Sequence, residues 1–192
     1  LLILLFVAVY RLSDITMGIM ANPFYLDLGF TKSDIAEVAK LYGFIMTMVG
    51  AFFCGSLVSR VGLYKPLMLG AVLVAITNLL FAWMAGQGAD KFALTLVISA
   101  DSFGAGVAAT AFIAYLSSLT NRHYTATQYA IFSSLMTLPG KVVSGFSGVF
   151  VETFDYQSFF VVCAGLGLPA ILMVLWLMRY QSELDDRVKS VH

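Results

Sequence analysis

Long, uninterrupted apolar stretches dominate this chain and leave it few ways to fold. Six of them follow one another, at residues 1–24, 34–58, 66–86, 92–119, 126–150 and 157–179. A helix that crosses a bilayer needs about 20 such residues, because each residue adds about 1.5 Å along its axis. The stretches are continuously apolar rather than alternating, which favours helices over a membrane β-barrel. We therefore expect an all-α integral membrane protein with six transmembrane helices over residues 1–180.

The composition agrees with a membrane protein. Apolar residues make up 60% of the 192 residues and charged residues only 11%, whereas a soluble domain is about 25% charged. This composition excludes a nucleic-acid binder, a disordered chain and a disulfide scaffold. Cys54 and Cys163 lie far apart inside apolar stretches, and no His or Cys residues cluster. We therefore expect no disulfide, no metal site, no cofactor and no enzyme site.

The basic residues of the short polar segments predict the orientation in the membrane. Two of them, Lys32 and Lys91, lie on one predicted side. Six lie on the other side, namely Arg60, Lys65, Arg122, Arg179, Arg187 and Lys189. Short cytoplasmic segments carry the excess of Lys and Arg. We therefore expect both ends of this segment to be cytoplasmic, with residues 181–192 as a cytoplasmic tail.

One of these polar segments carries a motif. Residues 55–65 read Gly-Ser-Leu-Val-Ser-Arg-Val-Gly-Leu-Tyr-Lys. Gly55, Arg60, Gly62 and Lys65 resemble the gating loop motif G-x-L-x-D-R-x-G-R/K of the major facilitator superfamily. Ser59 stands where the motif has Asp, and the final basic residue comes late. The resemblance implies that the six helices form half of a twelve-helix transporter; the alternative is an ordinary cytoplasmic loop with positive charges.

Two ionisable residues of the first stretch lie where lipid would surround them. A charge near the bilayer centre costs about 2.5–3.5 kcal/mol on insertion scales, so such residues face the bundle interior or a watery path. Arg11 and Asp14 are three residues apart and therefore share one helical face, which Gly18 and Asn22 continue. They form either a local ion pair or a polar stripe along a cavity, and the two readings are compatible. Pro23 is expected to break or end this helix.

Two further ionisable residues lie in the fourth and fifth stretches. Asp101 is a candidate for proton coupling, because a lone carboxylate in a low dielectric can exchange a proton near neutral pH. It can equally be held by hydroxyl groups, or paired with Lys141. Lys141 shares a polar face with Ser134 and Thr137. This lysine suits an anionic substrate, but it also suits a role as the partner of Asp101 or Asp14.

Several strings resemble the AmpG muropeptide permeases of the major facilitator superfamily. The most specific is Thr-Ala-Thr-Gln-Tyr-Ala at residues 125–130. The strings around residues 111–114 and 148–152 and the pair formed by Arg11 and Asp14 are also similar, as are the basic residues Lys40, Arg60 and Lys65. The resemblance covers nearly all of residues 1–180. Two departures are Ser102, where we expect Asn, and Lys141, where we expect Arg.

The resemblance implies a function. AmpG-type permeases import N-acetylglucosaminyl-anhydro-N-acetylmuramyl peptides across the inner membrane of Gram-negative bacteria, driven by protons, for cell-wall recycling. The expected partners are therefore the muropeptide, protons, the bilayer and an N-terminal half of the same transporter. The alternatives are a transporter of another anion, such as acetyl-CoA or a phosphorylated sugar, and a non-transporting membrane protein built on the same helices.

The resemblance also implies roles for individual residues. Asp101 or Asp14 binds the coupled proton, while Arg11 and Lys141 meet carboxylates of the peptide stem. The candidate sugar and amide contacts are Tyr10, Asn22, Tyr115 and Gln128.

Overall fold

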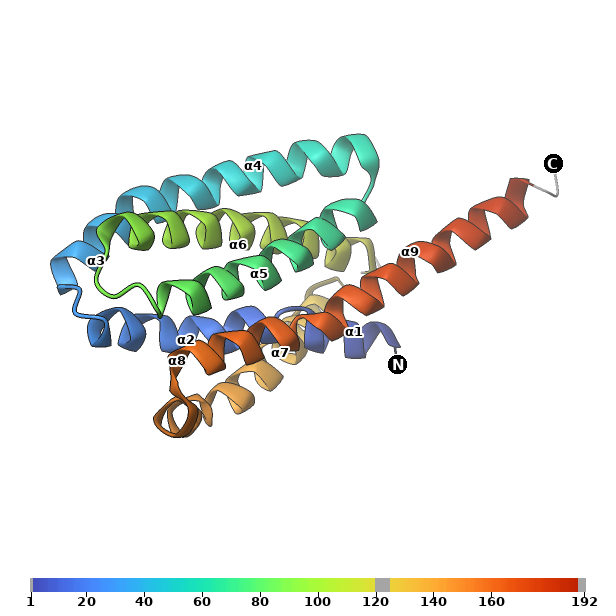
Figure 1. Ribbon diagram of the computed structural model, residues 1–192. Coiled ribbons are helices and arrows are strands. Elements are labelled where there is room, and N and C mark those ends of the chain that lie inside the picture. Colours follow the sequence, from blue (N-terminus) through green and yellow to red (C-terminus); the bar gives the residue numbers. More distant parts are fainter. Residues whose placement is uncertain (1, 120–124, 190–192) are drawn as a thin grey trace.

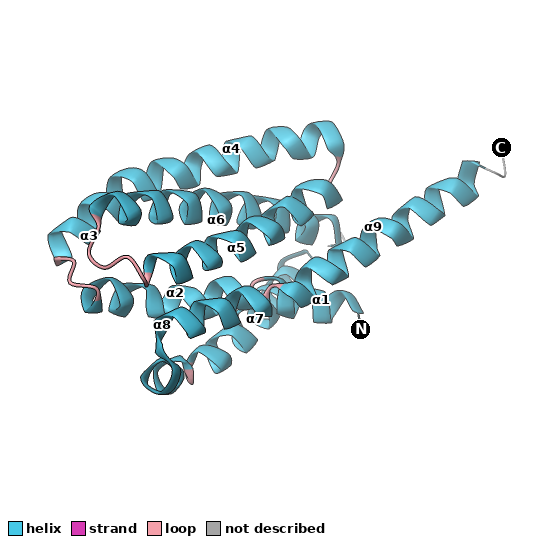
Figure 2. Ribbon diagram, in the orientation of Figure 1, coloured by secondary structure: helices cyan, strands magenta, loops and turns pink. Residues whose placement is uncertain are grey.

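The computed structural model describes residues 2–119 and 125–189, and these fold almost entirely into helices joined by short loops (Figure 2). The helices are α1 (Leu2–Tyr10), α2 (Leu12–Asp27), α3 (Lys32–Val38), a π-helix η1 (Ala39–Gly43), α4 (Phe44–Val61), α5 (Tyr64–Met84), α6 (Lys91–Leu119), α7 (Thr125–Ser144), α8 (Ser147–Leu166) and α9 (Leu168–Lys189). No strand occurs among the described residues. The all-α class is therefore confirmed.

Five helical segments in the described part of the chain are long and apolar enough to cross a membrane. They are Leu4–Asp27, Lys32–Val61, Tyr64–Met84, Lys91–Leu119 and Ser147–Tyr180. The stretch expected at 126–150 lies in α7 and the start of α8, where residues 130–144 form a shorter apolar helix. The helix α9 continues through most of the segment expected as a tail.

The long helices run roughly parallel or antiparallel to one another, whereas the first part of α8 crosses them (Figure 1). The start of α1 and the end of α9 lie toward the same end of the bundle, and the connection between α4 and α5 lies there too. The segment around α3 and the connection between α5 and α6 lie at the opposite end. Consecutive passes therefore alternate in direction, as successive membrane crossings must.

Small residues bring α4 and α6 into close contact. A Cβ atom on Gly50 would lie 2.3 Å from the Phe103 carbonyl oxygen, and one on Gly106 would lie 2.3 Å from that of Thr47. Small residues permit such backbone contact between membrane helices, where packing rather than the hydrophobic effect drives association. Elsewhere α7 packs on α1 and α2, and α5 packs on α6 and α8.

Three positions of the backbone need comment. Pro23 lies inside α2, which continues to Asp27, so the expectation that it breaks or ends the helix is wrong. Gly62 has φ +81° and ends α4. Asp155 has φ +77° at a corner within α8, where its carboxylate accepts a hydrogen bond from the Ser158 backbone N–H at 2.8 Å. The chain turns at this corner before it continues toward α9 (Figure 1).

Candidate functional site

An ion pair sits where the first membrane segment is interrupted. α1 and α2 meet at Arg11, whose φ of −98° and ψ of 2° place it outside both helices. The guanidinium Nη2 lies 2.5 Å from the Asp14 carboxylate, and the two side chains are only 22% and 14% exposed. The buried Nε of Arg11 has no hydrogen-bond partner among the described residues. The expected local ion pair therefore forms, and it lies within the bundle rather than on its surface.

A second carboxylate stands close to this pair. The Oδ1 atom of Asp101, on α6, accepts a hydrogen bond from the Thr77 hydroxyl of α5 at 3.1 Å. Asp101 is close enough to Arg11 and Asp14 for all three charges to interact. The first membrane segment and α6 thus bring one cation and two carboxylates together in a low-dielectric interior, where such charges interact strongly.

Lys141 stands apart from these three residues. It is exposed on α7, and no carboxylate lies within ion-pair distance of it among the described residues. Of the alternatives left open by the sequence, the described structure has Asp101 held by a hydroxyl group rather than paired with Lys141. The neighbouring Gly140 faces Ile15 so closely that a Cβ there would lie 2.7 Å from it. That contact fixes α7, and with it Lys141, against α2.

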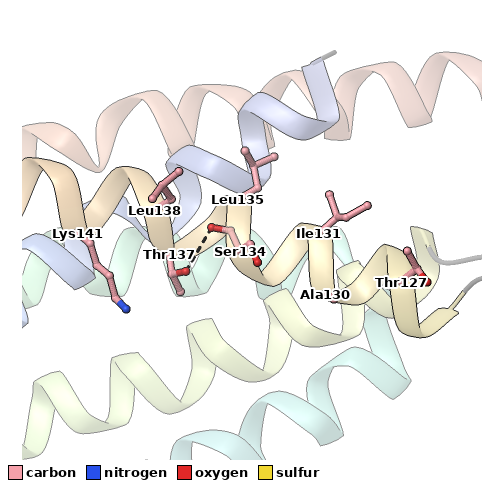
Figure 3. Close-up of a pocket in the computed structure, with 8 residues that line it drawn as sticks. All are labelled: Thr127, Ala130, Ile131, Ser134, Leu135, Thr137, Leu138 and Lys141. Carbon is pink, nitrogen blue, oxygen red and sulfur yellow. Dashed lines mark hydrogen bonds between the residues drawn. The ribbon is translucent and has the colours of Figure 1, made fainter.

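An open cleft of about 600 Å³ runs along α7. In Figure 3, Lys141 and the hydroxyl groups of Ser134 and Thr137 lie on one side of the helix. Leu135 and Leu138 point to the other side. The Thr137 hydroxyl donates to the Ser133 backbone carbonyl at 3.1 Å, so it belongs to the helix's own hydrogen bonding. Lys141 therefore supplies the free charge of this cleft.

A buried polar network that the sequence reasoning missed ties three helices together. The side-chain amide of Asn78, fully buried in α5, donates to the Ser13 hydroxyl at 2.7 Å. Ser13 in turn donates to the Cys163 backbone carbonyl of α8 at 2.6 Å. Asn78 could have been singled out from the sequence, because a polar residue within an apolar membrane stretch requires a partner inside the bundle. Asn78 directly follows Thr77, the residue whose hydroxyl donates to Asp101.

Two of the predicted contact residues are packed in the core. The Tyr10 hydroxyl donates to the Leu67 carbonyl at 2.9 Å, and its ring stacks on Phe112 with centroids 4.7 Å apart. Tyr115 is 3% exposed in the same apolar cluster. Contacts between these residues and a substrate stay predictions, because neither residue lines a described cleft.

The other two predicted contacts lie on different helices. Asn22 is exposed on α2 and lines a cleft with Lys40. Gln128 is half-buried near the start of α7. Asn22 thus continues the open face of α2 beyond Gly18, where an added Cβ atom would meet no other atom within 4 Å.

The loop motif takes up the end of α4 and the start of α5. Gly55 and Arg60 lie in α4, and Lys65 lies in the first turn of α5. Gly62 adopts a positive φ that glycine tolerates best, so the reversal between the helices needs only two residues. Its role in gating stays a prediction.

Within the described residues, no three His, Cys, Asp or Glu side chains gather to hold a metal ion. Both cysteines are buried, and neither forms a disulfide with a described residue.

The sequence pattern that defines the Major Facilitator Superfamily matches residues 2–191. This chain belongs to that superfamily. Similar curated proteins include "Putative transporter AmpG 4" of Rickettsia conorii, 38% identical over 91% of this chain and 42% of the relative. The protein of the same name in Rickettsia felis is 38% identical over 92% of this chain and 43% of the relative. "Putative transporter AmpG 1" of Rickettsia bellii is 33% identical over 91% of this chain and 42% of the relative.

These comparisons confirm the predicted resemblance to the AmpG proteins and the superfamily. The printed names of these relatives describe putative transporters. The membrane-spanning helices indicate a multi-pass membrane protein. The chain spans less than half the length of these relatives.

Proposed function

We propose that this chain is part of a proton-coupled transporter that imports anhydromuropeptides for cell-wall recycling. The observation that carries the proposal is the charge cluster of Arg11, Asp14 and Asp101 inside the bundle, beside a helix that presents the free cation Lys141. Intramembrane charges are costly, so their presence at a helix break points to function. The AmpG-named relatives support the choice of substrate class.

The acidic and basic residues of the site have different proposed roles. Asp101, or alternatively Asp14, binds the coupled proton, because both are carboxylates inside the bundle and intramembrane carboxylates commonly form proton relays. Arg11 and Lys141 attract carboxylates of the peptide stem, since charge-assisted hydrogen bonds are the strongest polar contacts available. Proton binding at Asp101 changes the net charge beside Arg11 and so alters how strongly that arginine attracts an anion.

We further propose the membrane arrangement. The chain crosses the inner membrane six times with both ends cytoplasmic, and it pairs with an N-terminal half across a central cavity. The end of the bundle that holds Arg60 and Lys65 also holds the start of α1 and the end of α9, which supports this orientation. Substrate sites of such transporters lie near the midplane between repeats.

A second candidate is transport of another anion, such as acetyl-CoA or a phosphorylated sugar. The observation that favours it is Lys141 itself. A lysine binds phosphate well as a point charge but lacks the planar fork with which arginine holds a carboxylate by two hydrogen bonds.

Uptake by vesicles that carry the full-length protein tests both candidates. Labelled anhydromuropeptide is expected to accumulate only with a pH gradient, and unlabelled muropeptide is expected to compete where acetyl-CoA and glucose 6-phosphate do not. The variants Asp101→Asn and Lys141→Ala are each expected to lower uptake strongly. Undiminished gradient-driven uptake in both variants would refute the assigned roles, and competition by the phosphorylated compounds alone would favour the second candidate.

A further inference from the structure

A second cleft lies between α2 and the α3–η1 segment, at the end of the bundle opposite to the start of α1 (Figure 1). Its volume is about 390 Å³. Its walls are mostly apolar, and its polar lining comes from Asn22, Lys32 and Lys40. A cleft with apolar walls and a few convergent polar groups is the usual form of a small-molecule site.

An irregular turn places Lys40 in this cleft. The π-helix η1 interrupts the segment between α3 and α4 at Ala39–Gly43, and such turns occur frequently at functional sites. Gly43 faces α6, where a Cβ would lie 3.2 Å from the Ser102 hydroxyl oxygen. The wide turn therefore packs against the helix that carries Asp101, while Lys40 stays exposed.

The two lysines of the cleft have no carboxylate partner among the described residues. No carboxylate among the described residues lies within ion-pair distance of Lys32 or Lys40, although Glu37 lines a neighbouring cleft with Lys40. Nearby Lys91, by contrast, pairs with Asp34 at 2.6 Å. The side chain of Asn22 likewise forms no hydrogen bond to a described residue. The cleft thus offers free donors to a bound anion.

We propose that this cleft binds an anionic group of a transported solute, with Lys40 contacting a carboxylate and Asn22 hydrogen-bonding beside it. The inference rests on the proposed function and deepens it by adding a second anion subsite to that near Lys141. For a muropeptide the anion is a carboxylate of the peptide stem. Asn22 shares its face of α2 with Asp14 and Gly18, so a solute held here lies at one end of the stripe that leads to the ion pair.

Binding of a small anion to the purified full-length protein tests the subsite without transport. The probes are the dicarboxylate N-acetyl-alanyl-glutamate and its uncharged diamide, and the readout is ligand-dependent thermal stabilisation. We expect the dicarboxylate to stabilise the wild type and the diamide to have no effect. Lys40→Gln is expected to raise the half-saturating concentration about tenfold or more, because it removes a charge-assisted hydrogen bond. Lys40→Arg is expected to retain binding.

Arg179→Gln is the matched control, since it removes one exposed cation near the end of the last membrane segment. Equal binding by wild type and Lys40→Gln overturns the proposal, as does equal binding of the diamide. Stabilisation by phosphatidylglycerol but not by the dicarboxylate also overturns it, because the cleft then holds a lipid headgroup.

Uptake of labelled anhydromuropeptide by the same variants separates the two proposals. Binding that depends on Lys40 in a protein that takes up no muropeptide refutes the proposed substrate and supports the subsite. Muropeptide uptake whose KM is unchanged in Lys40→Gln supports the proposed function and overturns the subsite.

Discussion

Replacing the glycines between α4 and α6 by alanine tests the helix packing that holds Asp101 in place. The new Cβ of Gly50→Ala would lie 2.3 Å from the Phe103 carbonyl oxygen, and that of Gly106→Ala the same distance from the Thr47 oxygen. A carbon and a carbonyl oxygen pack at about 3.3–3.6 Å, so the helices must separate by roughly 1 Å. Overpacking of this kind costs about 1–3 kcal/mol per site.

The assay is thermal unfolding of the full-length protein in one detergent. Each single variant is expected to lower the apparent Tm by several degrees. The double variant is expected to lose less than the sum of the two, because the first alanine already separates the helices.

Gly148→Ala serves as the control, because nothing lies within 4 Å of a Cβ at that position of α8. It is expected to leave the Tm unchanged or to raise it slightly, since alanine favours a helix over glycine by about 1 kcal/mol. Tm values of Gly50→Ala and Gly106→Ala equal to that of the control would refute the close approach of α4 and α6.

Three further predictions concern the interior of the bundle. Tyr10→Phe is expected to lower the stability by about 1 kcal/mol, because the hydrogen bond to the Leu67 carbonyl is lost; an unchanged Tm in thermal unfolding would contradict that hydrogen bond. Asp14→Asn is expected to destabilise the protein by about 3–5 kcal/mol, because Arg11 loses its partner, and the double variant Arg11→Gln/Asp14→Asn is expected to lose less stability. Thermal unfolding measures both variants, and equal losses of stability would contradict the ion pair. Ser13→Ala is expected to cost about 1–3 kcal/mol, because it leaves the Asn78 amide unpartnered, and an unchanged Tm would contradict the network.

The sequence predicts the membrane class because hydropathy is a local property. An apolar stretch of about 20 residues predicts a membrane helix whichever other helices it packs against. The ion pair between Arg11 and Asp14 is predictable for the same reason, since the spacing of three residues places both on one helical face. A local pattern therefore suffices wherever the partners lie within one or two helical turns.

Contacts between distant helices could not be predicted in this way. The hydrogen bond from Asn78 to Ser13 joins residues 65 positions apart, and that from Thr77 to Asp101 joins residues 24 apart. The partners depend on which helices are neighbours and how each is rotated. The π-turn that exposes Lys40 likewise depends on packing of Gly43 against α6, which no local pattern specifies.

Substrate-induced proton movement is the direct test of proton coupling at the interior charge cluster. Anhydromuropeptide is added to vesicles that carry the full-length protein in weakly buffered medium, and the external pH is followed. Proton coupling at Asp101 predicts an external alkalinisation with the wild type, because protons enter with the solute, and none with Asp101→Asn. Muropeptide uptake by the wild type without alkalinisation, or equal alkalinisation with Asp101→Asn, would contradict the assignment of the interior charge cluster to proton coupling.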